Sequence, residues 1–197
     1  AFRRDDIICA NYHNLVSDGT WAMFKRIGNQ FYDMGINRLY KAYQKYLGDE
    51  VVDVSLLAAS EQGVYDKYLS VLATKKGQDS VVLVLANRYE DRMVHVDFQF
   101  EQDYRLVKEA VFTAPNLYSY VSGERTKDVF GTTENQLDIP HFGAYTVPNK
   151  SVVFLTLEKC GDVTEVMAED FEGYEAMDAP VTLSKADPAT SVQVAGD

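Results

Sequence analysis

The chain has 197 residues, of which 46% are hydrophobic and 25% charged, an ordinary composition for a globular protein with a sizeable core. Its formal net charge of −11 argues against nucleic acid and anionic membranes as partners, because both require a basic surface. No segment approaches the run of about 20 apolar residues that a membrane-spanning helix needs. The 13 Tyr and 10 Phe suit sugar contacts or a sandwich core, and the core is the favoured interpretation.

Residues 5–12 are expected to form a short buried strand built on the apolar run Ile7, Ile8, Cys9 and Ala10. A continuous run is typical of a strand that is covered on both faces, as in a parallel sheet. The polar loop that follows is rich in turn-forming residues. Beyond this loop, we expect the apolar cluster of Trp21, Met23, Phe24 and Ile27 to cap the end of a barrel.

Residues 36–47 are predicted to form a helix. Its apolar stripe recurs at helical spacing and consists of Ile36, Leu39, Tyr40, Tyr43 and Leu47. Lys45 suits the negative end of the helix dipole in the last turn. Gly48 is expected to end the helix in the left-handed conformation that favours glycine.

A series of short strands follows the helix. The predicted strands cover residues 50–56, 65–74, 80–87, 93–100, 107–113, 136–139, 143–147 and 151–157. Short alternating strands separated by turns indicate an antiparallel β-sandwich or jelly roll. The fold class is therefore mainly β, with an antiparallel sandwich preceded by a strand, a loop and a helix in a second structural context. The family resemblance given below implies that this second context is the terminal β/α unit of a (β/α)8 barrel.

The chain becomes acidic after Gly161, which favours a solvated linker. Residues 180–184 and 191–194 are then expected to be strands of a further β domain. The predicted organisation has three parts. These are the end of a catalytic barrel (1–48), a C-terminal sandwich (49–160) and an acidic linker with the start of a further domain (161–197).

Two features bear on the cellular location. Cys9 and Cys160 either form a disulfide or remain two unpaired buried thiols, and their number does not decide between these states. Asn149, Lys150 and Ser151 form an N-glycosylation sequon beside a turn. Since the chain begins without Met or a signal-peptide core, we expect a processed piece of a longer polypeptide. The sequon favours an extracellular or secreted location.

Catalytic and metal-binding motifs are missing from the sequence. The histidines His13, His95 and His141 do not form a metal motif, and no nucleophile elbow, phosphate-binding loop or dinucleotide fingerprint occurs. The carboxylates fit turns and solvated faces better than the paired arrangement that glycosidic cleavage needs. We therefore expect no catalytic residue, metal or cofactor in this chain.

The loop after the predicted buried strand is the candidate binding site. Residues at the carboxyl end of a barrel strand line the active site of such enzymes. In this chain they are Asn11, Tyr12, His13 and Asn14, whose amide and aromatic groups suit sugar hydroxyls and rings. Turn formation is the alternative explanation for these residues.

The order of these elements resembles the C-terminal part of family 51 α-L-arabinofuranosidases, over roughly residues 5–159. The resemblance is carried by Ala10-Asn11 after the strand, by Leu39-Tyr40 and Tyr43 on the helix, and by Pro148-Asn149-Lys150-Ser151-Val152 in the last strand. Other glycosidases that combine a barrel with a sandwich share this plan. The family usually has a sugar-contacting Gln where this chain has Asn14.

The resemblance implies part of a secreted glycoside hydrolase acting on polysaccharide, with both catalytic glutamates on barrel strands upstream of residue 1. The sandwich would then pack on that barrel, stabilise it and offer a surface for homo-oligomerisation. The alternative is a non-catalytic glycan-binding or structural sandwich of an extracellular glycoprotein. The predicted strand–loop–helix at the start favours the enzyme, because a free-standing binding module has no use for it.

Overall fold

The computed structural model describes residues 15–17, 22–57, 68–116, 119–122, 129–161 and 190–194. Across these ranges the chain is mainly β, with one helix and three sheets. The predicted strand at residues 5–12 and most of the predicted acidic linker lie outside them. The barrel unit at the start of the chain therefore stays a prediction.

The body of the molecule consists of two sheets. One has the order β10-β9-β12-β7-β6-β4, with strands β4 (Glu50–Val52), β6 (Leu69–Lys76), β7 (Ser80–Asn87), β9 (Tyr104–Thr113), β10 (Gly131–Ile139) and β12 (Ser151–Lys159). The other has the order β11-β8-β13-β5, with strands β5 (Val54–Leu57), β8 (Val94–Phe100), β11 (Ala144–Val147) and β13 (Thr190–Val194). All described pairs in these sheets are antiparallel except β13–β8.

The main core lies between these two sheets. Leu83 and Leu85 of β7 and Leu155 of β12 are fully buried in one cluster with Val96 and Phe98 of β8. Burying such side chains contributes about 1.5–3 kcal/mol each. This arrangement confirms the predicted mainly β fold with facing antiparallel sheets, and it is consistent with a β-sandwich.

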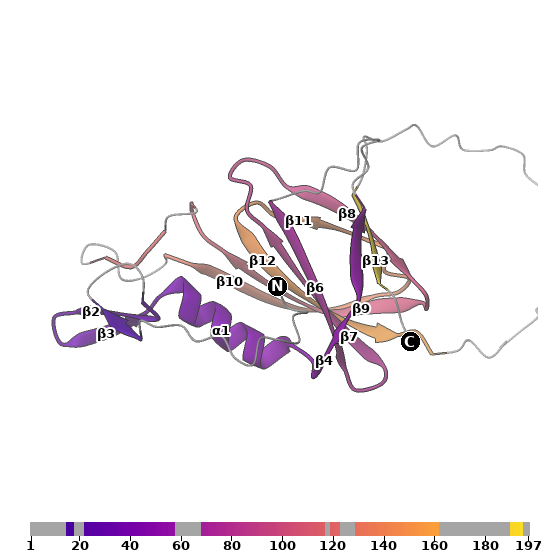
Figure 1. Cartoon of the computed structure of the whole chain (residues 1–197), viewed down its shortest axis with the longest axis horizontal. Coiled ribbons are helices and arrows are strands. Elements are labelled where there is room, and N and C mark those ends of the chain that lie inside the picture. Colours follow the sequence, from indigo (N-terminus) through magenta and orange to yellow (C-terminus); the bar gives the residue numbers. More distant parts are fainter. Residues whose placement is uncertain are drawn as a thin grey trace, which may run out of the picture.

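The six-stranded sheet is buried on its outer face as well. There α1 (Gly35–Tyr46) contributes Ala42 and Tyr46 to a second cluster, with Val82, Val84 and Phe154 of the sheet. The Phe154 ring lies 5.1 Å from that of Tyr46. Figure 1 shows the helix running along this sheet. Two covered faces explain why the apolar run of β7 is continuous rather than alternating.

The helix is confirmed, within one residue of its predicted ends, but its buried face differs from the predicted stripe. Tyr40 is 40% exposed, whereas Ala42 and Tyr46 are buried. Asn37 is also buried. Its amide donates a 2.8 Å hydrogen bond to the carboxylate of Asp33, which compensates for the burial of this polar group. The stripe was counted from large apolar residues alone, so it missed a small residue that lets the helix approach the sheet.

The predicted left-handed cap at Gly48 is wrong. In the described residues the glycines with positive φ are Gly28 and Gly77. Gly48 is needed for a different reason: a Cβ there would lie 1.7 Å from the Lys75 carbonyl oxygen. The backbone approaches β6 this closely because the N–H of Gly48 donates to the hydroxyl of Thr74 and that of Asp49 to the Lys75 carbonyl.

A small sheet lies beyond the first turn of α1 (Figure 1). It consists of β1 (Val16–Ser17), β2 (Phe24–Ile27) and β3 (Gln30–Asp33), and β2 and β3 form a hairpin around Gly28. Of the apolar cluster predicted to cap a barrel, Phe24 and Ile27 lie on β2, whereas Trp21 lies outside the described residues and the capping role stays a prediction. Ile27 packs against a third cluster formed by Met34, Val121 and Val129.

The last described strand differs from the predicted domain organisation. Residues 191–194 were assigned to a further β domain, but β13 lies between β8 and β5 within the second sheet. Its parallel pairing with β8 joins segments almost 100 residues apart, which no local sequence pattern reveals. The strand predicted at 50–56 is divided into β4 and β5, which belong to different sheets. The predicted strands from 65–74 to 151–157 agree with β6 to β12 in order, with ends shifted by up to five residues.

Replacing Gly48 with Ala is expected to lower the free energy of unfolding by about 3 kcal/mol, the upper end of overpacking costs, because the added methyl group meets backbone. Urea unfolding measures the change. Gly161→Ala is the matched control, since a Cβ at Gly161 has nothing within 4 Å. Equal stability of the two variants would contradict the close approach.

A second prediction concerns pH. The Lys45 ammonium lies 2.7 Å from the Glu134 carboxylate, and this bond lowers the pKa of Glu134 from 4.5 to about 2. Because the folded pKa is depressed, the ion pair stabilises the fold fully above about pH 4.5 and is lost as pH falls toward 2. Both side chains are exposed, so the effect is small.

The measurement for this prediction is the urea midpoint between pH 5 and pH 2 for the native chain and for Glu134→Gln. The native chain should lose more stability than the variant across that interval. Parallel pH profiles for the two proteins would show that the ion pair contributes nothing to stability.

Candidate functional site

The predicted sugar-binding residues Asn11, Tyr12, His13 and Asn14 lie outside the described residues, as does Cys9. Their roles, including the bridge from Cys9 to Cys160, stay predictions. Cys160 itself is half-buried at the end of β12, where its N–H donates to the Asp103 carbonyl. It lines a hollow with Asp79, Asp103 and Glu158.

Asn149 lies on the turn between β11 and β12, as predicted for the sequon. Its side-chain amide donates a 2.5 Å hydrogen bond to the Glu90 carbonyl. A glycan attached to that nitrogen would have to displace this bond. Glycosylation at Asn149 stays a prediction.

Two further findings concern the described residues only. No group of three or more His, Cys, Asp or Glu side chains among them is arranged to hold a metal ion. None of their helices has both the length and the apolar character to cross a membrane. His95 pairs with Asp97 and Thr146 on a strand face, and His141 pairs with Asp103 in a turn.

A cavity of about 200 Å³ lies on the outer face of the six-stranded sheet, beside the first turn of α1. Its floor is one row of neighbouring residues across three strands. Val152 of β12 pairs with Ala86 of β7 on one side and with Phe112 of β9 on the other. Leu39 and Phe130 add to the apolar lining.

The cavity exists because the helix begins where it does. The adjacent row on the same face of the sheet is covered by α1 and consists of Val84, Phe154 and Ala110. At the floor row the sheet presents the small Ala86, and the first residue of the helix is Gly35, which has no side chain. A Cβ on Gly35 would come within 2.9 Å of the Phe130 ring. The ring therefore packs over the start of the helix.

Two basic residues lie at the end of the floor strands. Arg88 directly follows β7 and Lys150 directly precedes β12, so both lie just outside the sheet. Both line the cavity, whereas none of its described lining residues is Asp or Glu. Asn116 and Ser119 add polar groups from the loop after β9.

Lys150 has an unusual backbone. Its φ of 51° lies in the left-handed region, which costs a residue other than glycine about 1–3 kcal/mol. Neighbouring bonds hold it there: its N–H donates to the Tyr89 carbonyl at 3.0 Å, and its carbonyl accepts from Ala114 at 3.2 Å. Its ammonium donates to the Glu90 carbonyl at 2.9 Å.

Asn87 fixes the loop that carries Arg88. Only 1% exposed, it donates its side-chain amide to the carbonyls of Arg92 and Val147, both at 3.1 Å. Its side-chain oxygen accepts the N–H of Tyr89 at 3.0 Å. One buried amide thus ties together both ends of the loop between β7 and β8 and the end of β11.

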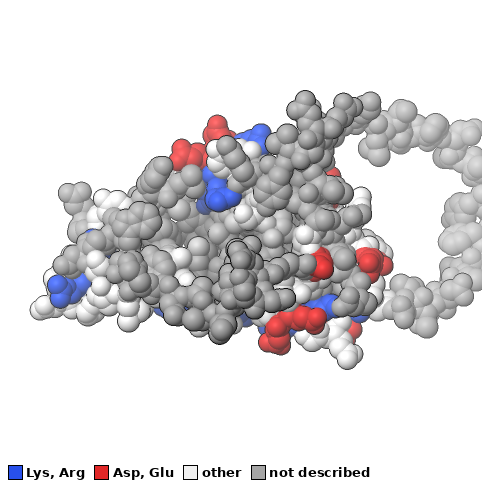
Figure 2. All heavy atoms as spheres, in the orientation of Figure 1, with Lys and Arg blue, Asp and Glu red and all other residues white. Residues whose placement is uncertain are grey.

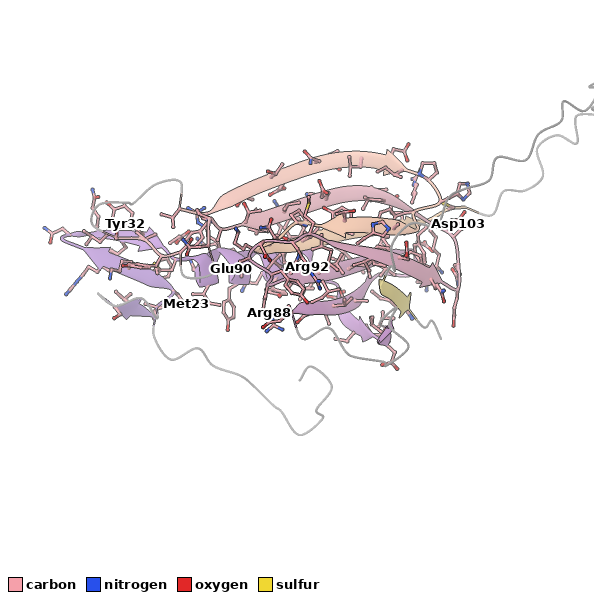
Figure 3. The ribbon with its side chains drawn as sticks, turned by 90° about the horizontal axis from the view of Figure 1, so that it is seen from above. Met23, Tyr32, Arg88, Glu90, Arg92 and Asp103 are labelled. Carbon is pink, nitrogen blue, oxygen red and sulfur yellow. The ribbon has the colours of Figure 1, made fainter. Side chains whose placement is uncertain are left out.

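Aromatic and cationic side chains pack along this loop. The guanidinium of Arg92 lies 3.9 Å from the centre of the Tyr89 ring, within the range of a cation–π contact. Tyr68 contacts the same ring, with centroids 4.7 Å apart. Figure 3 places Arg88, Glu90 and Arg92 in one region, well apart from Asp103 along the long axis.

The charges on the described surface are otherwise dispersed. On the face in Figure 2, the Lys and Arg atoms of the described residues lie in separate small groups, some of them beside Asp and Glu atoms, without an extended basic patch. The cavity differs because it combines an apolar floor, two cations and no described carboxylate in its lining. Such a site can hold a small molecule with an apolar face and a negative group.

Sequence reasoning missed this site. It left residues 88–92 between the predicted strands 80–87 and 93–100 and placed no function there. The available signal consisted of two separate features. The apolar strand β7 is followed directly by Arg88, and Lys150 stands two residues before Val152, where the apolar run of β12 begins. Only the pairing of β7 with β12 brings Arg88 and Lys150 to the same end of the sheet.

No protein-family profile matches the chain, and no curated protein matches it in sequence. Solved structures do match it. The fold is related to that of glycoside hydrolase family 51 α-L-arabinofuranosidases, as three of them show.

The first is α-L-arabinofuranosidase from Thermotoga maritima in its arabinose complex, with a TM-score of 0.54 and 9% identity over 70% of this chain and 32% of that one. The family 51 enzyme from Thermotoga petrophila has a TM-score of 0.53 and 10% identity, covering 73% and 32%. The family 51 enzyme from Xanthomonas axonopodis pv. citri has a TM-score of 0.53 and 17% identity, covering 70% and 29%. The chain thus spans about a third of these structures, and the likeness is one of fold.

Replacing Asn87 with Ala is expected to lower the free energy of unfolding by about 1–3 kcal/mol, because the buried Val147 carbonyl loses its partner. Chemical denaturation measures it. Gln136→Ala, at an exposed position on β10, is the control and should stay within about 0.5 kcal/mol of the native chain. A neutral Asn87→Ala variant would show that the amide does not hold the loop.

Proposed function

We propose that this chain is the C-terminal segment of a glycoside hydrolase that acts on polysaccharide, with arabinofuranosidase-like character. Two catalytic glutamates would lie upstream of residue 1, on the strands of a (β/α)8 barrel. One would act as nucleophile and the other as acid and base, as in retaining glycosidases. This chain would supply the last β/α unit, residues 1–48, and the sandwich that follows.

The observation that carries this proposal is the order of layers. A helix directly before the strands covers the outer face of the six-stranded sheet, and a second sheet covers its inner face. The match to family 51 structures extends over 70–73% of the chain and 29–32% of theirs. Because the chain matches about a third of these structures, we expect it to act together with an upstream part. A sandwich that buries a helix on its outer face is suited to support a barrel.

Secretion and oligomerisation belong to the same proposal. A secreted enzyme would fit the sequon at Asn149, which lies on a turn next to the loop between β7 and β8. Polysaccharide or oligosaccharide would be the substrate, and the sandwich would offer a surface for self-association.

The cavity supports a second candidate function, that of a glycan-binding sandwich without catalysis. Its apolar floor and polar rim are the usual composition of a small-molecule site. The two functions differ in the upstream polypeptide: only the enzyme requires two glutamates there.

The test uses the longer polypeptide from the same gene and an aryl α-L-arabinofuranoside. We expect turnover by the longer polypeptide, and a loss of about 10²–10⁴-fold or more when either upstream glutamate becomes Gln. The chain of 197 residues alone should release no aryl alcohol. Absence of paired upstream glutamates, or undiminished turnover after their replacement, would overturn the enzyme proposal and leave the binding function.

A further inference from the structure

We propose that the position between β5 and β8 is an acceptor site for an extended strand, and that residues 190–194 of a second copy of this chain occupy it in a strand-swapped dimer. In the structure the chain's own β13, the yellow strand in Figure 1, fills this position. The inference specifies the surface for the self-association that belongs to the proposed function. It does not depend on glycosidase activity.

The acceptor site holds β13 by backbone pairing on both sides. On one side β13 is parallel to β8, in a register that places Val192 opposite Phe98. On the other side it is antiparallel to β5, with Val192 opposite Leu56. Main-chain hydrogen bonds supply the affinity when a strand is added to a sheet. These bonds are the same whichever copy donates the strand, so exchange between two copies loses none of them.

Both walls of the acceptor site are held in place by contacts other than β13. On its far side β8 pairs with β11, and its residues Val96 and Phe98 are buried in the main core. The other wall, β5, follows β4 after a single residue, and β4 pairs with β6 of the six-stranded sheet. Val54 of β5 also packs against the main core. Departure of β13 therefore leaves two positioned edges with unpaired backbone groups, which favour the addition of a strand.

The connection to β13 is long enough for exchange. Residues 162–189 separate Gly161, just after β12, from Thr190 at the start of β13. A chain of this length spans up to about 95 Å when extended, at about 3.4 Å per residue. A tight turn would return β13 to its own sheet, whereas this length also reaches the acceptor site of a neighbouring molecule.

The exchanged segment is neutral, whereas the segment before it is acidic. Residues 190–194 contain two valines and a threonine, which suit a strand, and no charge. Residues 162–178 carry several carboxylates and no basic side chain. In a swapped dimer both acidic segments cross between the same two molecules and repel each other. Salt screens this repulsion, so it should favour the dimer.

The chain's own strand competes with that of a second copy. An intramolecular connection gives the tethered strand an effective concentration up to about the millimolar range. The closed monomer is therefore favoured in dilute solution. Exchange is expected when the chain refolds at a protein concentration near that range.

Refolding of the full chain from urea tests the exchange. We expect dimer after refolding at about 1 mM and monomer after refolding at about 10 µM. Light scattering on a size-exclusion column measures both. Added sodium chloride should raise the dimer fraction, and a fall would contradict the exchange. Monomer at both protein concentrations would overturn the proposal.

A proline variant shows whether β13 is the exchanged strand. Val192→Pro removes a backbone donor from the middle of β13, so this chain should stay monomeric at both concentrations with its acceptor site open. Thr190→Pro is the matched control, because the first residue of a strand tolerates proline, and it should dimerise as the native chain does. Equal dimer fractions for Val192→Pro and the native chain would place the contact elsewhere and sink the proposal.

A fluorescent peptide of residues 189–195 probes the open site. In anisotropy titrations it should bind the Val192→Pro chain at least about tenfold more tightly than the native chain, whose own β13 competes. The same peptide with proline at position 192 is the control and should not bind. Equal affinity for the two chains would contradict the proposal, as would absent binding to a Val192→Pro chain with native near-ultraviolet circular dichroism.

If Val192→Pro does not fold, refolding of the native chain decides the question alone. None of these measurements uses turnover. Failure of the enzyme proposal would appear as an inactive longer polypeptide with strand exchange intact, whereas failure of the present one would appear as absent exchange with arabinoside hydrolysis intact.

Discussion

The burial of β12 on both faces is the constraint on which the rest of the structure depends. This strand lies between β7 and β9, with Leu155 in the core between the sheets and Phe154 under α1. A strand with two apolar faces requires two covering layers, so the helix is as necessary to the sheet as the second sheet is. The cavity lies over Val152, where the layer formed by the helix ends.

The same strand pairing that builds the core also assembles the candidate site. Ser151 pairs with Asn87 at the end of β12 and β7. The chain segments that adjoin this pair, before Ser151 and after Asn87, leave the sheet at the same place. The buried amide of Asn87 then holds one departing segment, and the hydrogen bonds from Lys150 hold the other. Positions for two cations follow from a register that is fixed by the hydrophobic core. A slip of that register by one residue would turn every one of these side chains to the opposite face.

Local patterns predicted the helix and the strands β6 to β12, because apolar periodicity and turn residues are properties of short segments. They joined β4 and β5 into one strand, although the two belong to different sheets. They did not predict the hairpin of β2 and β3, whose four-residue strands carry Lys25 and Arg26 and lack a long alternating pattern. The partners of β13 and the cavity were also missed, since both depend on contacts between residues far apart in the chain. At Gly48, sequence reasoning identified a glycine requirement but gave the wrong cause, because close approach to Lys75 depends on the tertiary fold.

The position of β13 has a consequence for the order of folding during synthesis. Strands β5 and β8 are neighbours only through β13, which follows them by about 90 residues or more in the sequence. Until the ribosome has released that segment, the second sheet has two unsatisfied edges facing each other across a vacant position. Exposed edges of this kind pair readily with other chains, so the nascent protein passes through a period of aggregation risk. Among the described strands β13 is the last in the chain, and it completes a sheet whose first strand, β5, ends more than 130 residues earlier.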